Sequence, residues 1–229
     1  MTSWNSAKSM QPANEDSIKI THASLDEMLI GADGPSPSYQ ALIVLVGADG
    51  KGQPQIVLGT DWDQRKLSNG EYRPTRGSLK AAFGFGTKDK FETTLHAVTS
   101  ANAPANIALY GVFSKFQNFS TLPIAYQERG NDWGPAVTVP VVLKATSAEV
   151  TSYLNDAAMT RLQSQPDSPK YFADFVAVPL SCLLGTGSDE PAVYNEDALK
   201  NIMVDGIKRT LWDENQMRKA LLPYIAQHF

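Results

Sequence analysis

Cysteine is almost missing from this sequence, since the 229 residues include one, Cys182. A single thiol cannot form an intramolecular disulfide or supply a cysteine-based zinc cluster, which indicates a reducing environment and a fold held by its hydrophobic core. Cys182 lies in the apolar stretch VPLSCLLG, where a buried thiol is more common than a nucleophile. The disulfide-rich and zinc-cluster classes are therefore excluded.

Long hydrophobic runs are also missing. No stretch approaches the ~18 apolar residues that cross a bilayer, and MTSWNSAKSMQPANEDS at the start has no apolar signal core. We therefore expect no membrane partner and a cytoplasmic location, with secretion by a non-classical route left open. Residues 1–16 are polar and aperiodic, so we expect a flexible tail followed by a single domain over residues 17–229.

Excess positive charge is the third feature that the chain lacks, because its formal net charge is −4. An acidic chain has no general attraction to a phosphate backbone, so we do not expect nucleic acid as a partner. Walker phosphate loops, dinucleotide fingerprints, nucleophile elbows and zinc motifs are absent from the sequence as well. Hydrophobic residues at 42% and charged residues at 19% are typical of a globular protein.

What is present is a succession of strand and helix patterns. The apolar run YQALIVLVG and the run QIVLG flank ADGKGQP and predict a hairpin whose strands are buried on both faces. The polar, turn-rich stretch over 62–78 predicts a long surface loop, and LKAAFGFG predicts a short strand before a helix that ends by Pro104. Further strands are expected in NIALYGVFSKF, STLPIAYQE, AVTVPVVLKA and YFADFVAVPLSCLLG.

Helices are predicted by capping patterns. Thr146 and Glu149 form a capping box before TSYLNDAAMTRLQ, and Ser24 with Glu27 forms another within HASLDEMLIG. Two more helices are expected in NEDALKNIMVDGIKRTLW and DENQMRKALLPYIAQHF. This order of elements predicts an α+β fold with a mixed β-sheet sandwiched between helices.

The stretch FGFGTKDKFE carries the most specific pattern. Gly86, five residues and Glu92 match the first half of the Nudix box, G-x5-E-x7-R-E-U-x-E-E-x-G-U, where U is aliphatic. The late VPL turn and the order of elements over residues 39–229 are also similar to that family. The resemblance implies a Nudix-like α/β/α fold and, in active members, hydrolysis of a phosphoryl bond with metal ions held by the carboxylates of the box.

The second half of the box is not matched. Ser100 stands at the arginine position and Ala101 at the first glutamate position, while Pro104 and Ala105 occupy the paired glutamate positions. Alanine and proline cannot hold a hard cation. The resemblance therefore implies a non-catalytic binding or regulatory module without a cofactor, for a nucleotide-type ligand or a protein partner.

Positive charge concentrates around residues 65–80, which indicates an anionic ligand. The ligand-binding candidates are Arg65, Lys66, Arg73, Arg76, Gly84, Gly86 and Lys88. A basic surface loop without a ligand is the alternative, and Trp62 is either a base-stacking residue or the cover of a core edge.

A divergent magnesium-dependent hydrolase, cleaving a nucleoside diphosphate linked to another moiety, is the rival function. Glu92 is its catalytic candidate, and its metal ligands would be Asp61, Asp63, Glu71, Asp89 and Glu92. An interaction protein of another mixed fold is the third alternative. Fold class alone does not separate these functions.

Overall fold

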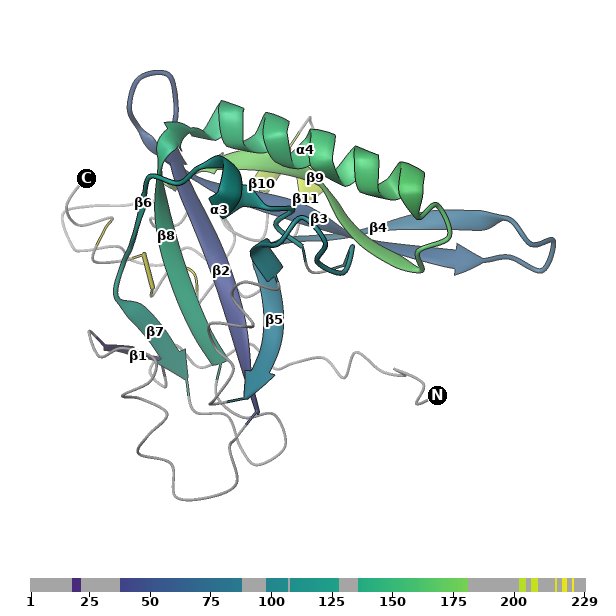
Figure 1. Cartoon of the computed structure of the whole chain (residues 1–229), viewed down its shortest axis with the longest axis horizontal. Helices are drawn as coiled ribbons and strands as arrows, with labels where there is room; N and C mark the ends of the chain where they lie inside the picture. The colour runs from purple at the N-terminus through teal and green to yellow at the C-terminus, as the bar shows by residue number, and fades with distance from the viewer. Residues whose placement is uncertain are drawn as a thin grey trace.

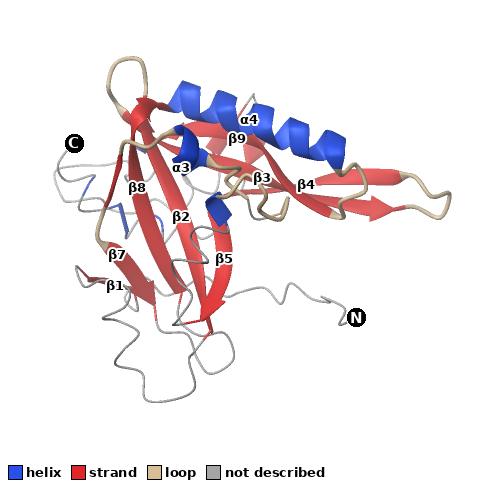
Figure 2. Cartoon of the chain, viewed as in Figure 1, coloured by secondary structure: helices blue, strands red, loops and turns tan. Residues whose placement is uncertain are grey.

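The fold is α+β, with one large mixed sheet (Figures 1 and 2). The computed structural model describes residues 18–21, 38–87, 98–106, 108–127, 136–180, 202–204 and 207–209, together with residues 217, 220, 221 and 224. Within these residues nine strands belong to the large sheet, and two short strands form a separate pair. The mixed sheet predicted from the sequence is therefore confirmed.

The first hairpin forms the centre of the sheet. Strands β2 (Ser38–Ala48) and β3 (Pro54–Lys66) pair as predicted, and the Asp49 carboxylate closes their turn by accepting hydrogen bonds of 2.8 Å from two backbone N–H groups. Every residue from Leu42 to Val46 is at most 1% exposed. Continuous burial explains the unbroken apolar run, because side chains on both faces of β2 enter a core.

One edge of β2 pairs with a parallel strand, β8 (Ala136–Thr146). Beyond β8 lie β6 (Phe119–Thr121) and β7 (Ile124–Gln127), which both pair with it, and then β1 (Ile18–Thr21), which pairs with β7. The strands predicted in STLPIAYQE and AVTVPVVLKA are confirmed by these elements.

The other edge of β2 is shared by two strands. β5 (Ala82–Thr87) pairs with the first half of β2, and β3 pairs with the second half. Past Gly59, β3 lies between β9 (Lys170–Pro179) and β4 (Tyr72–Lys80). The sheet therefore divides at this point. Residues 60–80, which we call the ribbon, extend past the end of helix α4 (Ser147–Ser164) (Figure 1).

The ribbon corrects the prediction of a long surface loop over residues 62–78. Most of that segment is strand, and only a short turn interrupts it, where the Leu67 N–H donates to the Glu71 carbonyl at 2.8 Å and Gly70 adopts a φ of 87°. Near the tip of the ribbon, Asp63 and Lys66 of β3 and Arg73 and Thr75 of β4 are exposed. The alternation of polar and apolar residues that identifies a half-buried strand is consequently absent there.

Helix α4 (Ser147–Ser164) covers one face of the sheet and confirms the predicted capping box. Thr146 accepts a hydrogen bond from the Glu149 N–H at 3.2 Å, and its own N–H donates to the Glu149 carboxylate at 2.9 Å. Val150 and Leu154 are fully buried in the core of this face. The hydrogen bonds from Thr146 lower the pKa of the Glu149 carboxyl.

A second core lies on the opposite face. Val44, Ile56 and Leu58 pack there with Met217 and Leu221, two residues near the C-terminus whose backbone is helical. The spacing of these helical residues agrees with the helix predicted in DENQMRKALLPYIAQHF. A complete sandwich with helices on both faces stays a prediction.

Two other secondary-structure predictions are wrong. NIALYGVFSKF contains turns and the short helix α3 (Val112–Lys115) in place of a strand, because Tyr110 and Gly111 adopt positive φ values of 46° and 76° that end any extended run. Within NEDALKNIMVDGIKRTLW, β10 (Ile202–Val204) pairs with β11 (Ile207–Arg209), so this part is not helical.

Several predictions fall outside the described residues, namely the tail over 1–16, the helix in HASLDEMLIG and most of the helix after Gly86. Among the helices that are described, none has the length and apolar character to cross a membrane. The single domain over residues 17–229 stays a prediction.

Candidate functional site

Four of the basic residues that the sequence analysis selected lie in the ribbon, namely Arg65, Lys66, Arg73 and Arg76. Arg65 lies directly opposite Arg73, and Lys66 opposite Tyr72, in the antiparallel register of β3 and β4. Lys66, Arg73 and Arg76 are exposed. Two arginines are therefore register partners close to the tip of the ribbon.

A row of three side chains crosses the base of the ribbon. Tyr171 of β9, Trp62 of β3 and Arg76 of β4 are register partners. The Tyr171 and Trp62 rings stack with centroids 5.8 Å apart and planes 6° from parallel, and the Arg76 guanidinium carbon lies 5.5 Å from the centroid of the Trp62 ring. Because β9 and β4 flank β3, the two neighbours cover opposite faces of Trp62.

Trp62 therefore belongs to the row and does not offer an open ring face to a base. It also packs against the core under α4. The sequence analysis considered two roles for Trp62, stacking on a base and covering the edge of a core. The structure supports the second role. Burial raises the pKa of the Tyr171 phenol, and the negative charge of the nearby Asp174 carboxylate raises it further.

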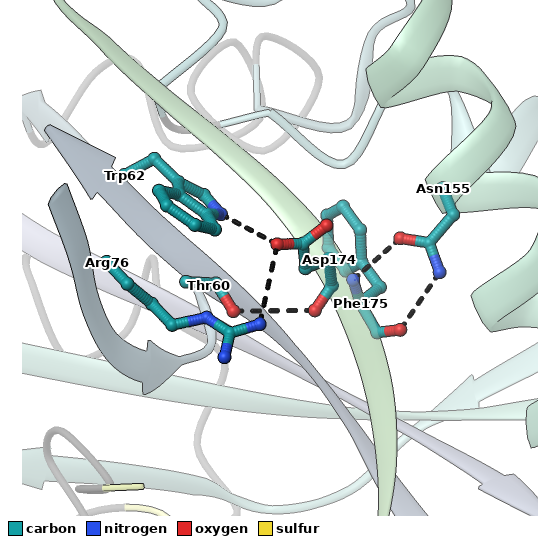
Figure 3. Close-up of polar contacts among 6 residues, drawn as sticks. All are labelled: Thr60, Trp62, Arg76, Asn155, Asp174 and Phe175. Atoms are coloured by element: carbon teal, nitrogen blue, oxygen red, sulfur yellow. Dashed lines mark hydrogen bonds and ion pairs between the residues drawn. The ribbon is translucent and has the colours of Figure 1, made fainter. Parts of the chain in front are cut away.

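The Asp174 carboxylate contacts two members of this row, Trp62 and Arg76 (Figure 3). Its Oδ2 accepts a hydrogen bond from Trp62 Nε1 at 2.9 Å and lies 4.0 Å from a terminal nitrogen of Arg76. The side chains of Arg76 and Asp174 are 36% and 50% exposed, so both reach solvent. An anionic group is thus held beside a cation that is still accessible to a ligand.

The backbone at Asp174 has an uncommon conformation, with a φ of 49°. Asp and Asn tolerate this left-handed region better than other non-glycine residues, although it remains less favourable than extended backbone. Thr60 Oγ1 donates to the Asp174 carbonyl at 3.5 Å. On the other side, Asn155 of α4 donates to the Phe175 carbonyl at 3.0 Å and accepts from the Phe175 N–H at 2.7 Å (Figure 3).

Asp61 pairs with a different cation. Lys80 Nζ lies 2.7 Å from Asp61 Oδ2, and the two side chains are 8% and 32% exposed. A lysine that is this deeply buried needs an opposite charge, because an unpaired buried ammonium is strongly unfavourable. Asp61 therefore has a structural role that is sufficient to explain its presence in β3.

The carboxylates of the hydrolase alternative lie at separate points of the ribbon where they are described. Asp61 is at its base, Asp63 is exposed further along β3, and Glu71 is in the turn, where it accepts a hydrogen bond from the Asn69 amide at 2.8 Å. Five residues of strand separate Asp61 from the end of β3, roughly 16 Å of ribbon. No metal-binding group of carboxylate, imidazole or thiol side chains occurs in the described part of the chain.

The first part of FGFGTKDKFE is a strand. Gly84 and Gly86 lie in β5, opposite Ala41 and Tyr39 of β2, which confirms the predicted strand. Lys88, Asp89 and Glu92 lie outside the described residues, so their proposed roles stay predictions.

The segment aligned with the second half of the Nudix box is described from residue 98. Helical backbone ends at Thr99, and the Ala103 N–H donates to the Ser100 carbonyl at 3.2 Å in the turn that follows. Ala105 is 6% exposed, and its carbonyl accepts hydrogen bonds from the Tyr110 hydroxyl and the Phe172 N–H. These positions form a turn that is anchored by the buried Ala103 and Ala105, while Ala101 and Pro104 are exposed.

Sequence reasoning did not select Asp174, Asn155 or Tyr171. A signal for Asp174 was present, because it is the one acidic residue within the strand pattern YFADFVAV. A carboxylate among buried positions needs a partner. Asn155 carried no such signal, since an asparagine on a helix is usually solvated.

No family model matches the chain, and no curated protein matches its sequence. Three solved structures are similar at 15% identity, all of them NrtR from Shewanella oneidensis. Whole NrtR gives a TM-score of 0.28 over 65% of this chain and 55% of that chain, so this chain spans about half of its length. The NUDIX domain of NrtR complexed with ADP ribose gives 0.30, covering 69% of this chain and 85% of the domain.

The third structure is NrtR complexed with a 27mer DNA, with a TM-score of 0.25 over 65% of this chain and 54% of that chain. The expectation that nucleic acid is not a partner stays a prediction. Overlaps this small do not establish a family for this chain.

Proposed function

We propose that this chain is a Nudix-like binding or regulatory module without hydrolytic activity, and that its ribbon recognises an anionic, nucleotide-type ligand. The carrying observation is the register of the ribbon, which sets Arg65 opposite Arg73 close to the turn. A protein partner with an anionic surface is the other ligand that this arrangement would accept.

Like charges that lie directly opposite each other in an antiparallel pair destabilise it, by roughly 0.2–1 kcal/mol. A bound phosphate reverses the sign of this contribution, because two guanidinium groups can then share its oxygens. Arg73 is exposed and thus accessible to a ligand. The ribbon is therefore better suited to an anion-bound state than to a free one.

The proposal of a non-catalytic module is supported by the turn that follows Thr99. A Nudix metal site needs a helix long enough to present successive carboxylates on one face, and residues 100–105 supply alanine, proline and a turn in that place. Asp61 is meanwhile engaged by Lys80.

Thermal unfolding with added ADP-ribose, a dinucleoside polyphosphate or NAD tests the ligand. We expect at least one of them to stabilise the wild-type chain, and Arg73→Glu to remove most of that stabilisation. Lys51→Glu, a charge reversal at an exposed residue in the β2–β3 turn, is the matched control and should keep it.

Equal loss in both variants would point to a non-specific charge effect and contradict a site on the ribbon. No stabilisation by any of the three ligands would leave only the protein-partner form of the proposal. Magnesium-dependent turnover of a ligand would contradict the non-catalytic module, and Glu92→Gln would then show whether Glu92 takes part in the hydrolysis, since an amide rarely replaces a metal-bridging carboxylate.

A further inference from the structure

We propose that Pro74 closes the outer edge of β4 to strand pairing, and so prevents a second copy of this chain from adding to the sheet through the ribbon. In the described part of the chain, β4 is the last strand on its side of the sheet, and its neighbour is β3. The inference concerns the edge of the ribbon and holds whether or not the ribbon binds a ligand.

The hydrogen bonds of β3 show in which direction the backbone of Pro74 points. The Gln64 N–H donates to the Pro169 carbonyl at 2.7 Å, away from β4, and Gln64 is the register partner of Pro74. Gln64 and Pro74 are therefore a pair without hydrogen bonds between them. The backbone nitrogen of Pro74 consequently faces the outer edge of β4, where the ribbon itself needs no donor.

The same alternation assigns the neighbouring residues of β4, since the register is continuous from Arg76 to Tyr72. Successive residues of a strand direct their backbone groups to opposite edges, so those of Tyr72 and Arg76 also face outwards. Those of Arg73 and Thr75 face β3. The outer edge thus presents carbonyls at residues 72, 74 and 76, while the donor in the middle is missing.

The outer edge of β9, on the other side of β3, is closed in a different way. The Phe172 N–H donates to the Ala105 carbonyl at 2.7 Å, and the Phe172 carbonyl accepts from the Tyr110 hydroxyl at 2.8 Å. Asn155 binds both backbone polar groups of Phe175. The ribbon extends past α4 (Figure 1), so the exposed part of β4 is closed by its own proline.

A second copy of β4 is the partner that this edge would otherwise accept, because an edge strand is a template for pairing with another chain. If two β4 strands pair antiparallel about residue 74, Tyr72 lies opposite Arg76 and Arg73 lies opposite Thr75. No arginine then faces another arginine directly, so charge alone does not prevent the pairing. Proline at residue 74 of both copies removes both hydrogen bonds of the central pair.

Sedimentation over a concentration series tests the inference with Pro74→Thr. Threonine suits a strand and restores the N–H, and circular dichroism shows that the variant is folded. Pro166→Thr, at an exposed residue outside the strands, is the matched control. We expect Pro74→Thr to self-associate about 5- to 150-fold more tightly than the wild type or the control, the factor that two hydrogen bonds contribute.

Equal sedimentation of the three proteins at every concentration would overturn the inference, as would equal tightening in Pro166→Thr. Neither result bears on ligand binding by the ribbon, so the proposed function is tested separately.

Amide hydrogen exchange measured by NMR examines the direction of the backbone in the wild type. The N–H groups of Arg73 and Thr75 should exchange slowly because they donate to β3, and those of Tyr72 and Arg76 should exchange quickly. In associated Pro74→Thr, the N–H groups of Tyr72 and Arg76 should become protected. The reverse pattern in the wild type, or association without this added protection, would overturn the inference.

Discussion

Replacing Asn155 by alanine should be among the most damaging single changes on α4. The Asn155 amide makes two hydrogen bonds to Phe175, of 2.7 and 3.0 Å, in a partly buried setting. Alanine leaves a backbone donor and a backbone acceptor without these partners. Each unsatisfied group costs about 1–3 kcal/mol, so we expect a loss of about 2–4 kcal/mol in the free energy of unfolding.

Urea unfolding followed by fluorescence measures this loss, and a loss of that size should lower the melting temperature by about 4–16 °C. Asp156→Ala, at the neighbouring exposed position of the same helix, is the control and should change stability little. Asn155→Ala within about 1 kcal/mol of that control would refute the reasoning, because it would mean that water or a local shift satisfies Phe175.

Asn155→Asp separates the two hydrogen bonds. The carboxylate still accepts from the Phe175 N–H, but its second oxygen replaces the donor and faces the Phe175 carbonyl. Protonation restores a donor, so the stability deficit relative to the wild type should narrow as the pH falls. A deficit that does not depend on pH would show that the bond to the carbonyl contributes nothing.

The remaining predictions concern packing, a buried phenol and a helix cap. Gly59→Ala should destabilise by about 1–3 kcal/mol in urea unfolding because its Cβ would lie 2.5 Å from an aromatic ring of β9, whereas Gly50→Ala, with nothing within 4 Å, should be neutral. Burial raises the pKa of Tyr110 to about 12, so the contribution of the protonated phenol to stability is complete below pH 10 and is lost as the pH rises towards 12. In a pH series of melting temperatures, Tyr110→Phe should reduce this alkaline decline. The lowered pKa of Glu149 means that the contribution of its carboxylate to stability is lost as the pH falls below about 4.5, and Glu149→Gln should reduce that acid sensitivity. An unchanged acid profile in Glu149→Gln would show that the contact between Thr146 and Glu149 does not cause the sensitivity.

The parts of the fold that could be predicted have strong local signals. α4 was predicted because Thr146 and Glu149 satisfy the first N–H groups of a helix through their own side chains. The β2–β3 hairpin was predicted because a strand buried on both faces has to be apolar at successive positions. In both cases the local sequence and the tertiary packing favour the same structure.

The ribbon was missed because tertiary pairing stabilises it. Beyond Trp62 its strands carry mostly polar residues, so their hydrogen-bond ladders, and not an apolar stripe, hold that part together. Asn69 and Gly70 were interpreted as part of a loop although they mark the turn of a hairpin. In IMVDGIKR, the Asp-Gly pair is a turn signal of the same kind, and Val204 indeed pairs with Ile207.

The sequence analysis selected the candidate residues without their geometry. Arg65, Lys66, Arg73 and Arg76 all lie in the ribbon, and their role in binding stays a prediction. Asp174 lies almost one hundred positions after Arg76 in the sequence and reaches it through the pairing of β9 with β3. A contact over this separation leaves no periodic trace in the sequence, so only the topology reveals it.

The division of the sheet at Gly59 separates two kinds of structural constraint on substitutions. Before this point, substitutions in β3 disturb a core that is packed on both faces. Beyond it, the tip of the ribbon can change its length or its charges while the core residues keep their contacts. Under the proposed function, hairpin tips exchanged between related chains should therefore transfer ligand preference without refolding the recipient.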